Sequence, residues 1–271
     1  MVTRVVVSVL LLPLLLGIVY LLPAVAVPVS IACICALAVY EALVPTGFVK
    51  ERRVVGYSIL LAVCTPFWVY WGSDPVVGRG AVLFYVLALF LEGMASQKRL
   101  KVEQLGGAFF IAVFVPMFLS AFVRLRGTED WRFVILLPMV VAFCSDIFAL
   151  FAGMFFGKHK LAPQLSPKKT VEGAIGGAVA APVCAMLYGL IFQFFVPGIM
   201  PSYLVLALYG FLGSIISQLG DLSFSFIKRE FGIKDYSNLL PGHGGILDRF
   251  DSVIFCAPLI ELLLYFLPVV R

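Results

Sequence analysis

The sequence predicts an all-α fold, namely a polytopic integral membrane bundle of about nine transmembrane helices with a cytoplasmic amino terminus. Three observations support this prediction. Hydrophobic residues make up 62% of the 271 residues and charged residues only 13%, which is too apolar for a soluble domain of this length. Apolar runs long enough to cross about 30 Å of hydrocarbon recur along the whole chain. Lysine and arginine are concentrated in alternate loops between these runs.

The predicted spans are the apolar runs at residues 5–22, 24–44, 54–72, 76–95, 105–124, 131–156, 173–196, 202–226 and 250–270. The first run is interpreted as a retained helix and not as a cleaved signal, because it lacks an Ala-x-Ala-like site and further apolar spans follow it. No soluble domain, low-complexity linker or internal repeat is visible in the sequence.

Lysine and arginine divide 15 to 5 between the two sides of the predicted bundle. The richer side carries Arg4, Lys50, Arg52, Arg53, Lys98, Arg99, Lys101, Lys158, Lys160, Lys168, Lys169, Lys228, Arg229, Lys234 and Arg249, and the other side carries Arg79, Arg124, Arg126, Arg132 and Arg271. Positively charged short loops stay in the cytoplasm, so the amino terminus is predicted to face the cytoplasm and the carboxy terminus the outside. This pattern accounts for the net charge of +5, and we expect no nucleic-acid partner.

We single out three carboxylates inside predicted spans on this richer side. They are Glu41 in the second span, Asp146 in the sixth and Asp221 in the eighth. An ionisable group in hydrocarbon is costly, so the three together favour one shared polar cavity. Each alone fits a helix–helix hydrogen bond, and Glu41 is near enough to a helix end to reach water. Small residues beside Asp146 and before Asp221 predict close helix packing that brings these two carboxylates toward each other.

Polar and charged residues crowd into residues 217–251, between two long apolar runs. The stretch contains Asp221, Asp235, Asp248 and Asp251, the bases Lys228, Arg229, Lys234, His243 and Arg249, and a turn with Gly244 and Gly245. Carboxylates bind hard cations, bases bind phosphate, and glycines allow close backbone approach. The combination predicts phosphate chemistry.

A second motif, S-P-K-K-T-V-E-G, occupies residues 166–173. Ser166 suits a helix N-cap and Pro167 the first helical position, which places Lys168 and Lys169 in the first turn. Unpaired backbone N–H groups and the helix dipole attract anions there. A lysine pair at a cytoplasmic helix end is also a common membrane anchor, and this alternative stays open. The motif is not a Walker A loop, because no G-x-x-x-x-G-K-[ST] precedes it.

Residues 225–251 resemble the signature of phosphatidate cytidylyltransferases, also called CDP-diacylglycerol synthases. The matching segments are S-F-I-K-R at 225–229, K-D-Y-S at 234–237 and L-P-G-H-G-G-I-L-D-R-F-D at 240–251. The 166–173 motif and the region of Asp146 also resemble this family, whereas residues before 131 resemble it only in hydropathy. We therefore expect one integral membrane domain over residues 1–271, with residues 1–130 as scaffold and residues 131–271 as the catalytic half.

The resemblance implies an activity and its partners. CTP and phosphatidic acid would give CDP-diacylglycerol and pyrophosphate in the plasma (inner) membrane, at a site facing the cytoplasm. The family uses a divalent cation, usually Mg²⁺, with room for a second cation, and the resemblance suggests a homodimer. A phosphatidate phosphate is already ionised near neutral pH, so the reaction needs charge neutralisation and alignment more than a strong base.

The resemblance also implies roles for individual residues. Asp221 and Asp248 would bind the metal, and Asp251 would join them or hold a water beside them. The expected catalytic residues are Asp221, Asp248, Lys169, Lys228 and Arg249. The expected substrate-binding residues are Ser166, Lys168, Glu172, Arg229, Lys234, Asp235, His243, Gly244, Gly245 and Asp146. His243 is interpreted as a phosphate or structural partner and not as a catalytic base, and His159 as a solvated loop residue.

Two other classes of function stay open. Another membrane lipid phosphotransferase, such as a polyprenol or phytol kinase, would use similar residues. A secondary transporter is less favoured, because it would place its charges at the midplane of two related halves. The CDP-alcohol phosphotransferases are disfavoured, since their D-x-x-D-G-x-x-A-R series is missing.

Overall fold

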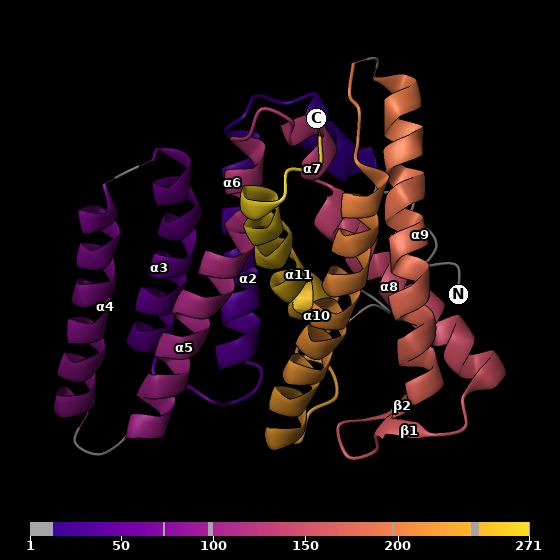
Figure 1. Cartoon of the computed structure of the whole chain (residues 1–271). Helices are drawn as coiled ribbons and strands as arrows, with labels where there is room; N and C mark the ends of the chain where they lie inside the picture. Colours follow the sequence, from indigo (N-terminus) through magenta and orange to yellow (C-terminus); the bar gives the residue numbers. More distant parts are fainter. Residues whose placement is uncertain (1–12, 73, 97–99, 197, 240–243, 271) are drawn as a thin grey trace. The chain divides into compact units, whose positions relative to one another are not determined.

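The computed structural model describes residues 13–72, 74–96, 100–196, 198–239 and 244–270. These ranges form a series of helices and one short hairpin (Figure 1). Residues 13–20 are helical. The helices after them are α2 (Ala26–Leu43), α3 (Arg52–Tyr70), α4 (Pro75–Ala95), α5 (Val102–Leu119), α6 (Ala121–Arg126), α7 (Trp131–Val134), α8 (Leu137–Phe156), α9 (Val171–Phe195), α10 (Tyr203–Glu230) and α11 (Leu247–Phe266). The strands are β1 (Lys160–Ala162) and β2 (Ser166–Thr170). The predicted all-α class is confirmed.

The predicted spans from the second to the ninth each coincide with one helix or with two consecutive helices. Among the described residues, 7 helical segments are long and apolar enough to cross a membrane: α2, α3, α4, α5 with α6, α7 with α8, α9 and α10. Helix α11 is not among them, and it carries Asp248, Arg249, Asp251 and Glu261. The first predicted span begins within residues 1–12, which lie outside the described residues.

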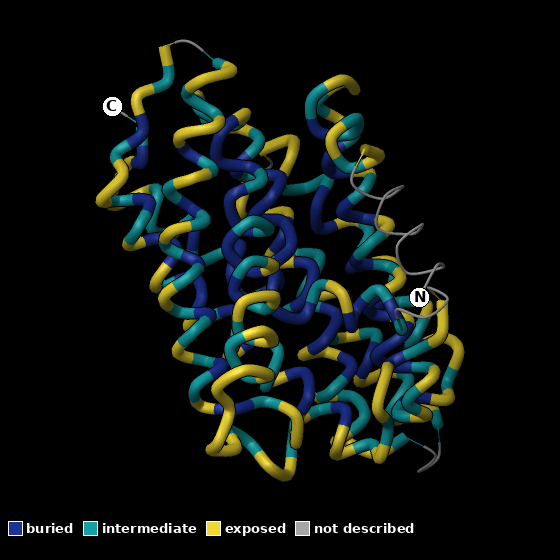
Figure 2. The backbone as a smooth tube through the Cα atoms, turned by 90° about the vertical axis from the view of Figure 1, so that its right-hand side faces the viewer, coloured by how far each residue is buried: buried dark blue, intermediate teal, exposed yellow. Residues whose placement is uncertain are grey.

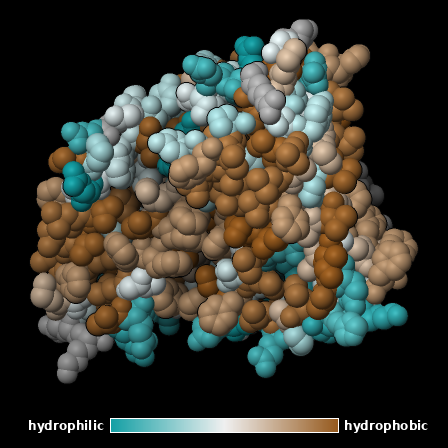
Figure 3. Space-filling model, in the orientation of Figure 1, coloured by the Kyte–Doolittle hydropathy of each residue, from teal (hydrophilic) through white to brown (hydrophobic). Residues whose placement is uncertain are grey.

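The long helices expose many large apolar side chains. Phe84 on α4 and Phe194 on α9 are 73% and 81% exposed, which would be unfavourable in water. Buried and exposed positions alternate along the helices (Figure 2), and hydrophobic side chains cover most of the face drawn in Figure 3. Such a surface suits lipid, so the chain is an integral membrane protein.

The chain folds into two compact units. The first unit comprises residues 1–127 and 233–249, and the second comprises residues 128–232 and 250–271. The segment 233–249, which holds the loop after α10 and the start of α11, therefore belongs with the amino-terminal helices.

In the first unit, α2 packs against α3 and α5, and α3 packs against α4. Polar groups join these helices in pairs. The hydroxyl groups of Ser58 on α3 and Tyr85 on α4 are 2.7 Å apart, and Gln104 on α5 donates to the Phe48 carbonyl oxygen at 2.6 Å. Helix α4 begins at Pro75, where the Asp74 side chain accepts the N–H of Val76, as expected for an N-cap.

In the second unit, small residues let α8, α9 and α10 approach closely. A Cβ added to Gly177 on α9 would lie 2.7 Å from the Ser145 carbonyl oxygen on α8. A Cβ on Gly210 of α10 would lie 2.5 Å from the Cα of Pro182 on α9. The hydroxyl groups of Ser145 and Ser214 are 2.6 Å apart and join α8 to α10. The predicted close packing of small-residue helix faces is confirmed in this unit.

The structure corrects the predicted start of α9. Residues 166–170 form strand β2, which pairs antiparallel with β1. Helix α9 begins at Val171, and its N-cap is Thr170, whose hydroxyl oxygen accepts the N–H of Gly173 at 3.1 Å. The prediction that Ser166 caps this helix, with Lys168 and Lys169 in its first turn, is wrong. Thr170 is also a suitable N-cap, and pairing with β1 satisfies the backbone of the residues before it.

Candidate active site

Lys169 and Asp221 form an ion pair between β2 and α10 in the second unit. Ser225, one turn further along α10, donates its hydroxyl to Asp221 Oδ1 at 3.3 Å. Lys169 is partly buried and its neighbour Lys168 is exposed, and adjacent side chains on a strand point to opposite faces. The hairpin, and not a helix end, therefore directs Lys169 toward Asp221.

A second charged pair lies deeper in this unit. Lys228 Nζ and Asp251 Oδ2 are 3.8 Å apart, and the two residues are 7% and 8% exposed. Next to Asp251, Ser252 donates its hydroxyl to Asp146 Oδ2 at 2.9 Å. Asp146, Asp221 and Lys228 all lie close enough to Asp251 for their charges to act on it. The second unit thus brings together five of the predicted site residues, as the sequence led us to expect for Asp146 and Asp221.

Glu172 and Arg229 hold the β1–β2 hairpin in place. The Glu172 carboxylate accepts the N–H of Lys158 at 3.1 Å and that of His159 at 3.2 Å. It also contacts His159 Nδ1 at 2.6 Å. Arg229 donates from Nε to the Leu165 carbonyl oxygen at 3.0 Å. In this structure the two predicted substrate-binding residues position the hairpin that carries Lys169, and His159 is a partner of Glu172.

Asp248 lies in the first turn of α11 and contacts the loop before it. Its Oδ2 atom accepts the N–H of Tyr236 at 2.8 Å and that of Gly245 at 3.0 Å. Gly244, between them, has φ of +81°, a conformation that favours glycine. These contacts lie within the first unit and fix the carboxylate that the family resemblance implies as a metal ligand.

Glu41 on α2 holds the same loop from the other side. It is 1% exposed and accepts hydrogen bonds from the Ser237 hydroxyl at 2.6 Å, the Ile246 N–H at 3.0 Å and the Leu247 N–H at 2.8 Å. Glu41 therefore does not reach water from its helix end. Sequence reasoning missed this role because the partners lie 196 to 206 positions further along the chain.

The remaining predicted site residues lie at the surface or outside the described residues. Lys168, Lys234, Asp235 and Arg249 are exposed, and Ser166 is partly exposed. His243 falls in residues 240–243, which the structure does not describe.

The donor chemistry of the carboxylates suits Mg²⁺. This ion takes one or two protein carboxylates and completes its octahedron with water and phosphate oxygens. Among the described residues, no group of three or more His, Cys, Asp or Glu side chains forms a complete metal-ligand set. Asp221 belongs to the second unit and Asp248 to the first.

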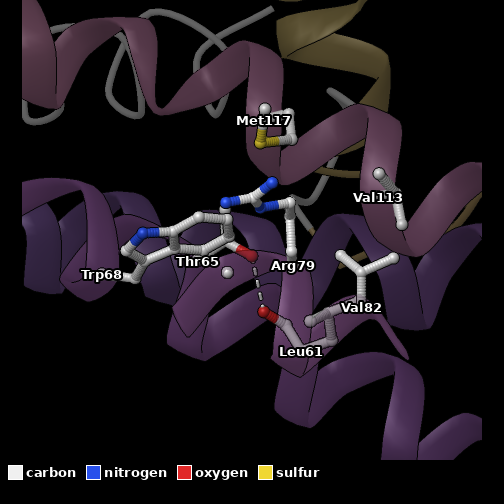
Figure 4. Close-up of a pocket in the computed structure, with 8 residues that line it drawn as sticks. Leu61, Thr65, Trp68, Arg79, Val82, Val113 and Met117 are labelled. Carbon is white, nitrogen blue, oxygen red and sulfur yellow. Dashed lines mark hydrogen bonds between the residues drawn. The ribbon is translucent and has the colours of Figure 1, made fainter. Parts of the chain in front are cut away.

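A cavity of about 260 Å³ lies in the first unit between α3, α4 and α5 (Figure 4). It is lined by Leu61, Thr65, Trp68, Gly78, Arg79, Val82, Val113 and Met117. Arg79 donates from Nε to the Pro75 carbonyl oxygen at 3.3 Å, and the rest of the lining is mainly apolar. None of the predicted site residues lines this cavity.

The fold and the charged cluster together define a polytopic membrane protein whose site suits phosphate chemistry. The sequence matches the model of the cytidylyltransferase family over residues 2–267, and the chain belongs to this family. The predicted resemblance is thereby confirmed.

Similar proteins carry the name phosphatidate cytidylyltransferase. The chain is 33% identical to that of Bacillus subtilis (strain 168) over 196 residues, which cover 72% of this chain and 71% of the relative. It is 36% identical to that of Rickettsia bellii (strain RML369-C) over 154 residues, covering 55% and 64%. It is 34% identical to that of Rickettsia prowazekii (strain Madrid E) over 179 residues, covering 65% and 78%.

Proposed function

We propose that this protein is a phosphatidate cytidylyltransferase, which makes CDP-diacylglycerol and pyrophosphate from CTP and phosphatidic acid. Family membership and the names of its relatives support this activity. The observation that assigns it to particular residues is that Lys169 pairs with Asp221 and Lys228 with Asp251, all within the second unit. Paired lysines and carboxylates at one place suit a reaction between two polyanions.

In this reaction a phosphate oxygen of phosphatidic acid bonds to the α-phosphorus of CTP. The bond from that phosphorus to the β-phosphate oxygen breaks, and pyrophosphate leaves with the electron pair. The attacking oxygen is already ionised near neutral pH, so the protein has to neutralise charge and align the reactants. We assign charge neutralisation to Lys169 and Lys228 and the positioning of the hairpin to Glu172 and Arg229.

We also propose that Asp221 and Asp248 bind Mg²⁺, with Asp251 beside them and room for a second cation. When bound, the cation would neutralise phosphate charge and orient the phosphates. Lys234, Asp235, His243 and Arg249 complete the proposed substrate site, together with Ser166 and Lys168. The site would face the cytoplasm from the inner membrane of a bacterial cell, and the proposed assembly is a homodimer.

One assay tests the activity directly. Purified protein in detergent is incubated with labelled CTP, phosphatidic acid and Mg²⁺, and lipid products are separated by thin-layer chromatography. We expect labelled CDP-diacylglycerol and an equal amount of pyrophosphate. A parallel reaction with ATP and a polyprenol or phytol tests the kinase alternative. A phosphorylated alcohol there, with no CDP-diacylglycerol in the first reaction, would overturn the proposal.

A further inference from the structure

Two carboxylates bind three consecutive backbone N–H groups just before and within the start of α11. Asp248 accepts the N–H of Gly245, and Glu41 accepts those of Ile246 and Leu247. The first N–H groups of a helix have no partner within the helix, so such acceptors stabilise its start. Asp248 acts locally, three positions after Gly245, whereas Glu41 reaches the helix start from α2.

Gly245 makes this approach possible. A Cβ at this position would lie 2.5 to 2.8 Å from the carboxylate atoms of Glu41. Real Cβ atoms do not come so close, and any other residue would push the Glu41 carboxylate away from the N–H groups. Glycine at position 245 therefore leaves room for a protein carboxylate within the first unit.

We propose that Glu41 is a positioning residue, which fixes the segment 245–247 and thereby the Asp248 carboxylate. Its two oxygens accept three hydrogen bonds and its side chain is buried. These oxygens are therefore already engaged by the protein. The kinetic part of this inference rests on the proposed function, because that function assigns Asp248 to metal binding. The structural part does not.

Glu41→Gln is the variant that tests it. Glutamine keeps the shape but replaces one acceptor oxygen with an NH₂ group, which faces an N–H or O–H donor. Oε1 accepts two of the three hydrogen bonds and Oε2 accepts one, so at least one of them is lost. We expect amide hydrogen exchange to become at least about tenfold faster in the segment 245–248. We also expect the apparent activation constant for Mg²⁺, the concentration that gives half-maximal activity, to rise roughly 10- to 100-fold. KM for CTP at saturating Mg²⁺ should change far less.

Glu92→Gln is the matched control. Glu92 lies on α4 in the same unit and pairs with Arg53 at 3.4 Å and with the Tyr57 hydroxyl at 3.4 Å. The same chemical change there should leave exchange in the segment 245–248 and the Mg²⁺ constant near wild type. If both variants altered the two readouts equally, the effect would be general loosening of the unit and the inference would be wrong.

Gly245→Ala tests the contact between residue 245 and the Glu41 carboxylate by changing residue 245. It replaces Glu41→Gln as the test if that variant does not fold. It should also speed exchange in the segment 245–248, and the double variant should be little worse than either single one, because both act on one contact. Unchanged exchange in the variant that folds would overturn the inference.

The kinetic and structural parts are separable. A wild-type protein that made no CDP-diacylglycerol would refute the proposed function, and the exchange comparison would still decide the structural role of Glu41. An active protein whose Glu41→Gln variant exchanged faster but kept the wild-type Mg²⁺ constant would refute the positioning role and leave the proposed function standing.

Discussion

The Lys169 ammonium contacts the Asp221 carboxylate, and both side chains are about a quarter exposed, at 25% and 23%. An ion pair whose side chains are exposed to this extent contributes only about 0–1 kcal/mol to stability. The fold therefore does not depend on this contact. This is consistent with the proposal that both charges meet a ligand.

Lys169→Ala should therefore lower activity without unfolding the protein. We expect kcat/KM for CTP or phosphatidic acid to fall by about tenfold or more, because one charge-assisted contact to phosphate is lost. The thermal midpoint in detergent should change little. Lys50→Ala is the control, since Lys50 is an exposed lysine on the same predicted side of the membrane. Wild-type kinetics for Lys169→Ala would make Lys169 a membrane-surface anchor.

Lys228→Ala should behave differently, because Lys228 and its partner Asp251 are buried. Removing one partner leaves an uncompensated buried charge, which costs about 3 kcal/mol or more. We expect a clearly lower thermal midpoint than for Lys169→Ala. The double variant Lys228→Met with Asp251→Asn should recover most of that loss. A Lys228→Ala protein as stable as wild type would show that the pair is not buried in the folded membrane protein.

Much of the fold could be predicted from local sequence features. Helix positions followed from apolar runs, and close packing around Asp146 and Asp221 followed from small residues at helical spacing. The start of α9 could not be predicted in this way, since Ser166 and Thr170 are both suitable N-caps. Only pairing of residues 166–170 with β1 selects Thr170.

The site was predicted in part. The charged residues that the structure joins in the second unit were all singled out from the sequence. The contacts of Glu41 and Glu172 were not, because hydrogen bonds between distant segments leave no local pattern. Gly245 could not be interpreted from the sequence for the same reason. A glycine in a polar motif suggested space for a ligand, whereas a Cβ added at this position would meet the Glu41 carboxylate.

Gly177→Ala should destabilise the second unit. The added methyl group would lie 2.7 Å from the Ser145 carbonyl oxygen, and the two helices must separate at a cost of about 1–3 kcal/mol. Gly106→Ala on α5 is the matched control, since nothing lies within 4 Å of its Cβ position. Alanine favours a helix over glycine by about 1 kcal/mol, so this control should be neutral or slightly stabilised. Thermal unfolding of both variants in detergent checks the prediction, and equal midpoints would contradict it.

The proposed orientation can be tested in cells. Single cysteines at positions 168 and 234, in a background without the native cysteines, should be unreactive toward a membrane-impermeant maleimide added outside. They should react once the membrane is permeabilised, because the loops rich in lysine and arginine are predicted to be cytoplasmic. A cysteine at position 128, between α6 and α7, should show the opposite pattern. Labelling of position 168 or 234 in intact cells would reverse the proposed orientation.

The sharpest prediction concerns Asp221 and Asp248 as joint ligands of one Mg²⁺. Asparagine keeps the shape of each side chain and removes its charge, so Asp221→Asn and Asp248→Asn should each abolish most turnover while the protein stays folded. Because both residues act through one ion, the double variant should be hardly slower than either single variant. Activity of the wild type should vanish on chelation and return with Mg²⁺.

Direct measurement of metal binding supplies a readout beyond activity. Titration with Mn²⁺, followed by electron paramagnetic resonance, should show one site that is weakened in both single variants. Asp130→Asn, a change in the loop between α6 and α7, is the control and should leave both turnover and Mn²⁺ affinity unchanged. Two activity losses that multiply, as independent sites would give, or a single variant that keeps near-normal turnover, would refute joint ligation. The first outcome would assign the two carboxylates to separate steps, and the second would remove that residue from the metal site.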